Sequence, residues 1–485
     1  MDYNVVVIGA GSGGLVSAYI CAVLKAKVAL IEKHRMGGDC LNTGCVPSKA
    51  LIRTATFLSH IKRHKEFGIA SATSEFKFSE IMERVQRVIG KVAPHDSIER
   101  YTKLGVDCIE GEAKILSPQE VRVNGKVITT KNIIVATGGR PALPKIPGLE
   151  KIEVLHTDNV WDIREQPKRL VIVGGGPIGC ELGQCFARLG TQVIQVQRSA
   201  QLLNREDNEV VEIMEERFRE EGVDLRLNTK PLAVDVRDGK NFLTVEQDGK
   251  KSEIEFDRLL VAAGRTPNAA GFGLEELGVT LNAKGAIEVD EYARTEVKNI
   301  FACGDVTSPY QFTHMAAHQA WYCAVNALFQ PLQKFKVDLT SIPWCTYTDP
   351  EIARVGYNEK EAKAKNIPYE VTTYPIDDLD RAIADEEDEG IVKVLTEPGK
   401  DKVLGVTICG YHAGDLLPEF VLARKYGLGL NKILGTIHMY PTMAEANKYV
   451  AGAWKKAHAP EGILNWVKKY NNFRRGKNGN TSTAV

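Results

Sequence analysis

The 485-residue sequence lacks a charge imbalance, a long apolar run and a dense cysteine framework. Its 62 basic residues are matched by 62 acidic ones, and nothing in this balance suggests a nucleic-acid partner. No apolar run reaches the length of a membrane span, and Met1-Asp2-Tyr3-Asn4 lacks the basic start of a signal peptide. Ten cysteines in so long a chain do not form a secreted disulfide framework. We therefore expect a cytoplasmic protein of about three domains, in a compartment that keeps thiols reduced.

Two of the cysteines lie in a glycine-rich stretch from Gly37 to Lys49, GGDCLNTGCVPSK. Cys40 and Cys45 are five residues apart, which on a regular helix separates their Cα atoms by roughly 8.6 Å, whereas a disulfide needs about 4.4–6.8 Å. Gly44 and Pro47 distort or restart a helix and would close this gap. Cys45 would then lie near a helix start, where the backbone dipole favours a thiolate. The pattern indicates a reversible disulfide; the alternative is two small apolar residues in a loop.

The chain contains a second cysteine pair with the same spacing. Cys180 and Cys185 have no helix breaker just before the second cysteine, so we expect both to pack inside a helix. We also expect Cys303 to be a small packing residue, and we predict no metal site.

A glycine fingerprint follows the first strand-like run, residues 5–8. Gly9, Gly11 and Gly14 form G-x-G-x-x-G ahead of an apolar helical stretch, and Glu32 ends the next strand. The glycines permit a tight turn and close approach of a pyrophosphate to the helix N-terminus, while the acid can bond ribose hydroxyls. Strand, helix and terminal acid together predict a dinucleotide-binding unit of the α/β class.

The fingerprint recurs 165 residues later. A strand over residues 170–173 precedes Gly174, Gly176 and Gly179, and a helix runs through residue 189. The repeat indicates an internal duplication, and hence two dinucleotides in one chain.

The stretch GGDCLNTGCVPSK resembles the redox motif of the pyridine nucleotide–disulfide oxidoreductases, a flavoenzyme family that includes dihydrolipoamide dehydrogenase, glutathione reductase and mercuric reductase. The resemblance extends from residue 5 to about residue 455. It implies FAD at the first fingerprint, NAD(P)H at the second, and a homodimer. It also implies two Rossmann-like domains and an α+β dimerisation domain. The expected boundaries are residues 1–149 with 267–336 for FAD, 150–266 for NAD(P)H, 337–455 for the interface and 456–485 for a basic tail.

Further segments match this family. Residues 133–138, ending in Thr137 and Gly138, and residues 259–264, ending in Gly264, each finish a strand with small residues that allow a close crossing. Residues 299–305 resemble the second flavin motif, whose aspartate, here Asp305, contacts the ribityl chain. The alternative for Asp305 is a turn aspartate beside a glycine.

The resemblance also implies a route for electrons. A nicotinamide hydride reduces the flavin, two electrons pass to Cys45, and Cys40 is freed to exchange with substrate. Lys49 and Glu181 match a lysine–glutamate pair beside flavin and nicotinamide; the alternative is a surface ion pair.

One segment departs from the disulfide reductases, in which the partner subunit supplies a histidine base held by a glutamate. Here residues 438–445 are HMYPTMAE, so Glu445 remains and Tyr440 replaces the acting histidine. A phenol with a pKa near 10 is a poor base, and His438 lies two residues back. Mercuric reductases share this tyrosine, but they carry a C-terminal cysteine pair, whereas the last cysteine here is Cys409.

These features predict a flavoprotein that passes electrons from NAD(P)H through FAD to Cys40 and Cys45. The expected acceptor is a disulfide, a small electrophile or a metal ion. The alternatives are a dihydrolipoyl dehydrogenase and a low-turnover redox-sensing or membrane-associated flavoprotein.

The second fingerprint predicts NADPH rather than NADH. Gln197 occupies the position that corresponds to Glu32, with Arg198 beside it and Arg205 nearby. An acid there would repel a 2′-phosphate, whereas arginines suit one. The alternative is two solvated arginines.

The tail is basic and carries Trp466, Tyr470 and Phe473 at helical spacing among lysines and arginines. A short amphipathic helix of this kind could contact an anionic membrane surface weakly. The alternative is a helix packed on the dimer, followed by a disordered end.

Overall fold

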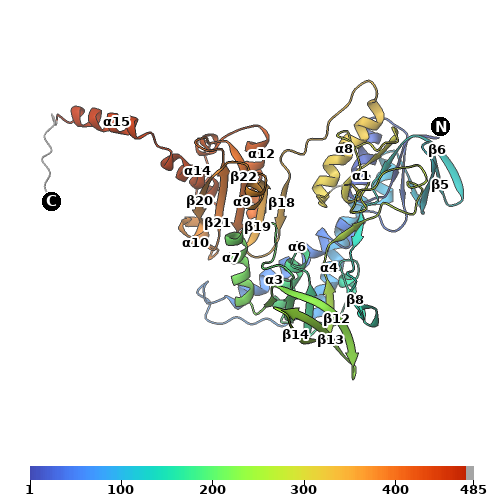
Figure 1. The fold of residues 1–485 in the computed structure, drawn as a ribbon, viewed down its shortest axis with the longest axis horizontal. Helices are drawn as coiled ribbons and strands as arrows, with labels where there is room; N and C mark the ends of the chain where they lie inside the picture. Colours follow the sequence, from blue (N-terminus) through green and yellow to red (C-terminus); the bar gives the residue numbers. More distant parts are fainter. Residues whose placement is uncertain (308, 477–485) are drawn as a thin grey trace. The chain divides into compact units, whose positions relative to one another are not determined.

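The computed structural model describes residues 1–307 and 309–476, which form two compact units. Unit 1 comprises residues 1–342 and 346–349, and unit 2 comprises residues 343–345 and the described chain from residue 350 onward. Both units combine helices with sheets (Figure 1). The predicted α/β fold class is confirmed.

The first parallel sheet of unit 1 is built around β1 (Tyr3–Ile8), whose Val5, Val6 and Val7 are fully buried. β1 pairs in parallel with β2 (Val28–Glu32) and β6 (Lys126–Val135). The parallel strands also include β3 (Val106–Glu110) and β17 (Ile300–Ala302), while β5 (Glu120–Val123) and β4 (Ala113–Ser117) extend the sheet beyond β6 with antiparallel pairing. β17 pairs with β6, so the chain returns to this sheet after residue 299.

The helices around this sheet include the redox segment, which begins beside the fingerprint turn that follows β1. α1 (Ser12–Val23) joins β1 to β2 and packs against α8 (Thr313–Phe329). Four further helices follow β2, namely α2 (Gly38–Asn42), α3 (Cys45–Lys62), α4 (Phe78–Val92) and α5 (Ile98–Lys103). α3 packs on α6 (Pro177–Arg188), which belongs to the second fingerprint.

The second parallel sheet of unit 1 repeats the arrangement of the first. Its order is β11 (Asp224–Arg226), β10 (Gln192–Val196), β9 (Arg169–Val173), β15 (Arg258–Val261) and β8 (Val154–Leu155). β9 is central and α6 follows it, as α1 follows β1. α7 (Asn208–Glu220) and an antiparallel sheet of β12 (Thr229–Arg237), β13 (Lys240–Gln247) and β14 (Lys250–Phe256) complete this part.

Unit 2 is an antiparallel sheet with helices around it (Figure 1). The strand order is β18 (Pro343–Thr346), β19 (Glu351–Gly356), β22 (Val403–Gly410), β21 (Ile391–Thr396) and β20 (Glu370–Pro375). The helices are α9 (Glu359–Ala364), α10 (Asp380–Ala384), α11 (Ala413–Leu416), α12 (Pro418–Lys425), α13 (Leu430–Leu434) and α14 (Glu445–Ala457). Val406, Ile408, Phe420 and Val450 are fully buried between them.

The basic tail forms the predicted helix, α15 (Glu461–Arg474), after a break at residues 458–460. Lys477 and the Asn/Gly/Ser/Thr end, for which the alternative interpretation of the tail predicted disorder, lie outside the described residues. Within residues 1–307 and 309–476, every helix is too short or too polar to cross a membrane.

Candidate active site and dinucleotide sites

The first fingerprint turns tightly because its glycines leave no room for side chains. A Cβ on Gly9 would strike the Ala136 carbonyl, and one on Gly14 would strike the Gly9 carbonyl. At Gly11 the Cβ position is open, with the nearest atom, Gly38 Cα, at 3.8 Å. An open position over the N-terminus of α1 is the cradle that a pyrophosphate requires, so these residues fit the FAD that the resemblance implies.

The second fingerprint reproduces this geometry residue by residue. A Cβ on Gly174 would strike the Ala262 carbonyl, and one on Gly179 would strike the Gly174 carbonyl. At Gly176 nothing lies within 4 Å of the Cβ position. The repeat in the sequence is therefore also a repeat in structure, with a second open cradle at the start of α6.

The acids and arginines at the strand ends differ between the two cradles. Glu32 accepts hydrogen bonds from the backbone N–H groups of Ala10 at 2.6 Å and His34 at 2.8 Å, so its carboxylate is fixed beside the first fingerprint. Gln197 directly follows the corresponding strand, β10, and its side chain is neutral, while Arg198 and Arg205 are exposed after it. The second cradle therefore has exposed cations where the first has an acid.

The two cysteines of the redox segment lie on separate helices, as the breakers predict. Cys40 is in α2, Cys45 is the first residue of α3, and Gly44 caps α3. A Cβ on Gly44 would lie 2.9 Å from the Asp39 carbonyl oxygen, so only glycine allows the two helices to meet this closely. Cys40 and Cys45 hydrogen-bond to each other through their side chains.

The redox segment is also attached to the first fingerprint. Gly38 has a left-handed φ of 56°, and a Cβ there would lie 2.6 Å from Gly11 Cα. The backbone at the start of α2 therefore rests on the fingerprint turn, which places the cysteine pair beside the first cradle.

The environment of Cys45 favours its thiolate. The hydrogen bond from Cys40 is the largest cause that lowers the pKa of Cys45, and although partial desolvation of the exposed residue's thiol opposes it, this pKa falls to about 6. The Thr313 hydroxyl, 3.3 Å from Cys45 Sγ, and the charge of Lys49 lower it further. The same hydrogen bond, together with burial, raises the pKa of Cys40 well above its usual value. With both cysteines reduced, the pair keeps one proton on Cys40 and a thiolate on Cys45.

Lys49 and Glu181 form an ion pair of 2.8 Å. Glu181 is buried and its other carboxylate oxygen accepts the Tyr347 N–H at 3.0 Å. The Lys49 ammonium also lies 4.2 Å from the centre of the Tyr347 ring. The pair is therefore not the surface ion pair that we considered as its alternative.

Arg265 connects the redox segment to the second flavin motif. It donates to Asp305 at 3.1 Å and to the Gly139 carbonyl at 2.9 Å, and it also pairs with Asp39. Burial raises the pKa of Asp305, against the opposing charge of Arg265. Sequence reasoning identified Asp305 but missed Arg265, although it directly follows the strand-ending glycine Gly264.

Other contacts also lay beyond the sequence analysis. Asn268 exchanges hydrogen bonds with the backbone and side chain of Thr137, which fixes the crossing after β6. Trp161 donates its indole N–H to the Thr43 carbonyl at 2.9 Å and holds the turn between the two redox helices. As expected, Cys180 and Cys185 are buried in α6 and Cys303 is buried beside β17.

In unit 2, Tyr440 and Glu445 have different partners. The Tyr440 phenol donates to Asp380 at 2.8 Å, and this hydrogen bond raises the pKa of Tyr440. Glu445 is buried and accepts from the Thr442 N–H and the Tyr449 hydroxyl, both at 3.4 Å. Within unit 2 the Tyr440 phenol is therefore paired with Asp380, while Glu445, the glutamate that holds the histidine in the disulfide reductases, is bonded to Thr442 and Tyr449.

Both ring nitrogens of His438 contact groups within unit 2. Its Nε2 lies 3.1 Å from Glu419 and its Nδ1 lies 3.0 Å from the Thr436 carbonyl, and the side chain is nearly buried. Both ring nitrogens face acceptors, so neither is placed to take a proton from a thiol.

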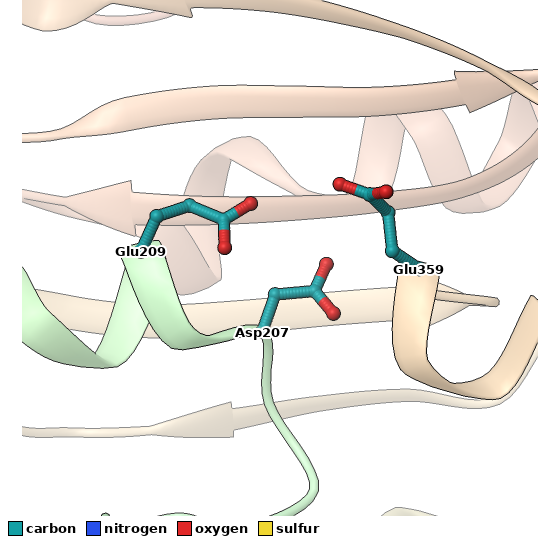
Figure 2. A group of neighbouring side chains, drawn as sticks. All are labelled: Asp207, Glu209 and Glu359. Carbon is teal, nitrogen blue, oxygen red and sulfur yellow. The ribbon is translucent and has the colours of Figure 1, made fainter. Parts of the chain in front are cut away.

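Figure 2 shows three acids that belong to different units. Asp207 and Glu209 stand at the start of α7 in unit 1, and Glu359 begins α9 in unit 2. Burial opposes ionisation of Glu359, but hydrogen bonds from Lys393 and Tyr369 outweigh it and lower its pKa to about 2. The charge of Glu359 is thus stabilised by partners in its own unit, and we assign these acids no metal.

Residues 3–320 match the family "Pyridine nucleotide-disulphide oxidoreductase", and residues 342–451 match its dimerisation domain. The chain is 34% identical to the mercuric reductase of Staphylococcus aureus, over 94% of this chain and 83% of that protein. It is 34% identical to the dihydrolipoyl dehydrogenase of Geobacillus stearothermophilus, over 92% and 94%. The structure resembles the HOCl-induced flavoprotein disulfide reductase RclA of Escherichia coli, with a TM-score of 0.82 and 26% identity over 93% of this chain and 99% of that one.

Proposed function

Because the chain belongs to the pyridine nucleotide–disulfide oxidoreductase family of FAD-dependent enzymes, we propose that it is an NADPH-dependent reductase of a thiol-reactive oxidant. The oxidant class comprises disulfides, small electrophiles and thiophilic metal ions. When bound, FAD supplies the transfer of two electrons from the nicotinamide to the disulfide of Cys40 and Cys45. The first cradle, with Glu32 and Asp305, is the proposed FAD site, and the second, with Arg198 and Arg205, is the proposed NADPH site.

The observation that carries the direction of the reaction is the Tyr440–Asp380 pair. A phenol whose pKa is raised by Asp380 keeps its proton at neutral pH, so it cannot act as a base. Oxidation of a dithiol substrate requires a base to remove the substrate's thiol proton. Reduction of a disulfide instead releases a thiolate, and the phenol stabilises it by turning its single O–H from Asp380 toward that sulfur. The pair therefore favours reduction over dihydrolipoamide oxidation.

The cysteine pair has the protonation that this direction needs. Cys45 holds the thiolate and Cys40 holds the proton, so transfer of that proton to Cys45 prepares Cys40 for attack. With a disulfide substrate, the Cys40 thiolate bonds to one substrate sulfur and the other sulfur leaves. Cys45 then attacks Cys40, restores the protein disulfide and releases the second substrate thiol. Two electrons thus pass from the cysteine pair to the substrate, together with the one proton that the pair holds, and solvent supplies the second proton.

We further propose a homodimer and the domain boundaries given by the sequence. The match of residues 342–451 to the dimerisation domain supports the dimer. The family resemblance implies that Tyr440 of the partner subunit serves Cys40. β17 pairs with β6 of the first sheet, which supports the assignment of residues 267–336 to the FAD domain together with residues 1–149.

The proposal is tested by comparing the two directions in purified holoenzyme. NADPH oxidation is followed with lipoamide, glutathione disulfide, Hg(II), Cu(II) and quinones, and the reverse reaction with dihydrolipoamide and NADP⁺ or NAD⁺. We expect at least one oxidant to be reduced faster than dihydrolipoamide is oxidised, and Cys40→Ser to abolish that reduction. Cys40→Ser also separates it from direct reduction of a quinone, which does not need the cysteines. Faster oxidation of dihydrolipoamide than reduction of every oxidant contradicts the proposal.

Two substitutions at Tyr440 test the role of the phenol. Tyr440→His restores a base and should raise dihydrolipoamide oxidation by on the order of 10²-fold where the geometry is retained. Tyr440→Phe should slow only the step in which Cys40 meets substrate and leave reduction by NADPH unchanged. Stopped-flow kinetics separate the two half-reactions. A Tyr440→Phe variant that slows reduction by NADPH and spares the second half-reaction shows that Tyr440 is elsewhere in the mechanism.

A further inference from the structure

The tail helix α15 carries apolar side chains that the described chain leaves in solvent. No side chain of α15, over its whole described length of residues 461–474, is buried. Trp466 is 64% exposed, Phe473 73% and Ile463 60%. With 3.6 residues per turn, Ile463, Trp466, Val467, Tyr470 and Phe473 fall within roughly a third of the helix circumference. The rings of Trp466 and Tyr470 stack with their centres 5.7 Å apart, which marks this common face.

The preceding helix shows that this exposure is particular to α15. α14 belongs to the same unit, and its Val450, Ala451 and Trp454 are buried in the core of unit 2. The three residues His458, Ala459 and Pro460 separate the two helices. The apolar face of α14 is therefore part of the core of unit 2, whereas the apolar face of α15 is exposed and available to bind another molecule.

The charge around the apolar face identifies the occupant. Residues 455–475 hold six basic residues and one acid, although the whole chain is balanced at 62 against 62. The remainder of the chain therefore carries a net negative charge, and the tail carries a net positive one. Lys468 and Lys469 flank the apolar arc, and long basic side chains at such borders reach the headgroups while the apolar face is buried.

We propose that α15 binds an anionic lipid surface, lying in the plane of the headgroups with Trp466, Tyr470 and Phe473 inserted. Aromatic residues with flanking lysines are the composition of helices at membrane interfaces. The 14 residues of α15 span about 21 Å, less than the roughly 30 Å of a bilayer core, so the helix lies on the membrane and does not cross it. An anionic surface attracts the tail and repels the net negative remainder of the chain, which makes the contact specific to the tail.

The test is sedimentation of the full-length holoenzyme with vesicles. One set contains phosphatidylcholine alone, and the other an equimolar mixture of phosphatidylcholine and phosphatidylglycerol. We expect binding to the anionic vesicles that is at least about tenfold tighter than to the neutral ones and that weakens with added salt. Binding to neither kind, or equal binding to both, overturns the proposal.

Two double variants and a matched control locate the contact. Lys468→Gln with Lys469→Gln, and Trp466→Ser with Phe473→Ser, should each weaken binding to anionic vesicles at least about tenfold. The control is Lys250→Gln with Lys251→Gln, an exposed lysine pair on β14, which should change nothing. NADPH-dependent turnover should be unchanged in all three, because none touches the cysteine pair. If the Trp466 and Phe473 substitutions leave vesicle binding intact but lower dimer association in light scattering, α15 packs on a second copy and the proposal is wrong.

Discussion

Thr313 offers a direct test of the electrostatics that prepare the cysteine pair. Its hydroxyl lies 3.3 Å from Cys45 Sγ and is one of the groups that lower the pKa of Cys45 from 9.0 to about 6. Thr313→Val removes this hydroxyl and keeps the shape of the side chain. The thiolate then loses one hydrogen bond, so its pKa must rise.

The size of the change follows from the strength of that bond. A hydrogen bond to a charged group contributes about 1.5–3 kcal/mol, and one pKa unit corresponds to about 1.36 kcal/mol. Cys45 is exposed, so water replaces part of the lost bond and the lower end of the range applies. The pKa of Cys45 therefore rises by roughly one unit, and the thiolate fraction at pH 7 falls from about nine-tenths to about half.

The assay is the pH dependence of alkylation in the reduced holoenzyme. The rate of modification by iodoacetamide follows the thiolate, and mass spectrometry of the peptide shows whether Cys45 or Cys40 was modified. The apparent pKa belongs to the first proton lost by the pair. Thr313→Ser, which keeps the hydroxyl, is the matched control and should titrate like the native protein. An unchanged pKa in Thr313→Val, or equal shifts in both variants, refutes the assigned hydrogen bond.

Two further changes test the cradles. Arg198→Ala should lower kcat/KM for NADPH about tenfold and leave kcat/KM for NADH unchanged, because about 1.4 kcal/mol of a charge-assisted bond to the 2′-phosphate is lost. Arg237→Ala, on β12, is the control. Equal losses of kcat/KM with both nucleotides contradict the assignment. Gly38→Ala should lower Tm and the amount of FAD per chain, because its Cβ would lie 2.6 Å from Gly11 Cα. Gly68→Ala has a similar left-handed φ but nothing within 4 Å, so it isolates backbone strain from the clash, and equal effects of the two substitutions exclude the clash as the cause.

Local patterns in the sequence predicted the parts of the fold that local physics determines. The strand at residues 170–173 was predicted to within one residue of β9, because an apolar run that ends at the glycine fingerprint defines it. The restart of the helix at Cys45 followed from Gly44, whose missing side chain is needed at that position. The duplication of the fingerprint predicted two equivalent parallel sheets.

Contacts between distant segments could not be predicted in this way. Thr313 lies 268 residues from Cys45, and Arg265 lies 226 residues from Asp39. At such separations no periodicity or spacing in the sequence predicts the contact. The partner of Tyr440 was missed for a related reason. The family pattern points only to Glu445, whereas the chain places Asp380 beside the phenol, from a helix 60 residues away. Chemistry at these positions depends on tertiary packing, which a single sequence does not display.

The break between α2 and α3 at Gly44 has a consequence for repeated opening and closing of a disulfide. In the proposed reaction the disulfide opens in every cycle, and a disulfide within one helix would have to unwind a turn of that helix each time it opened. Here Cys40 and Cys45 belong to different helices that meet at Gly44, so the sulfur atoms can part by rotation of their side chains. Such a rotation does not require the backbone hydrogen bonds within either helix to break, because neither helix contains both cysteines.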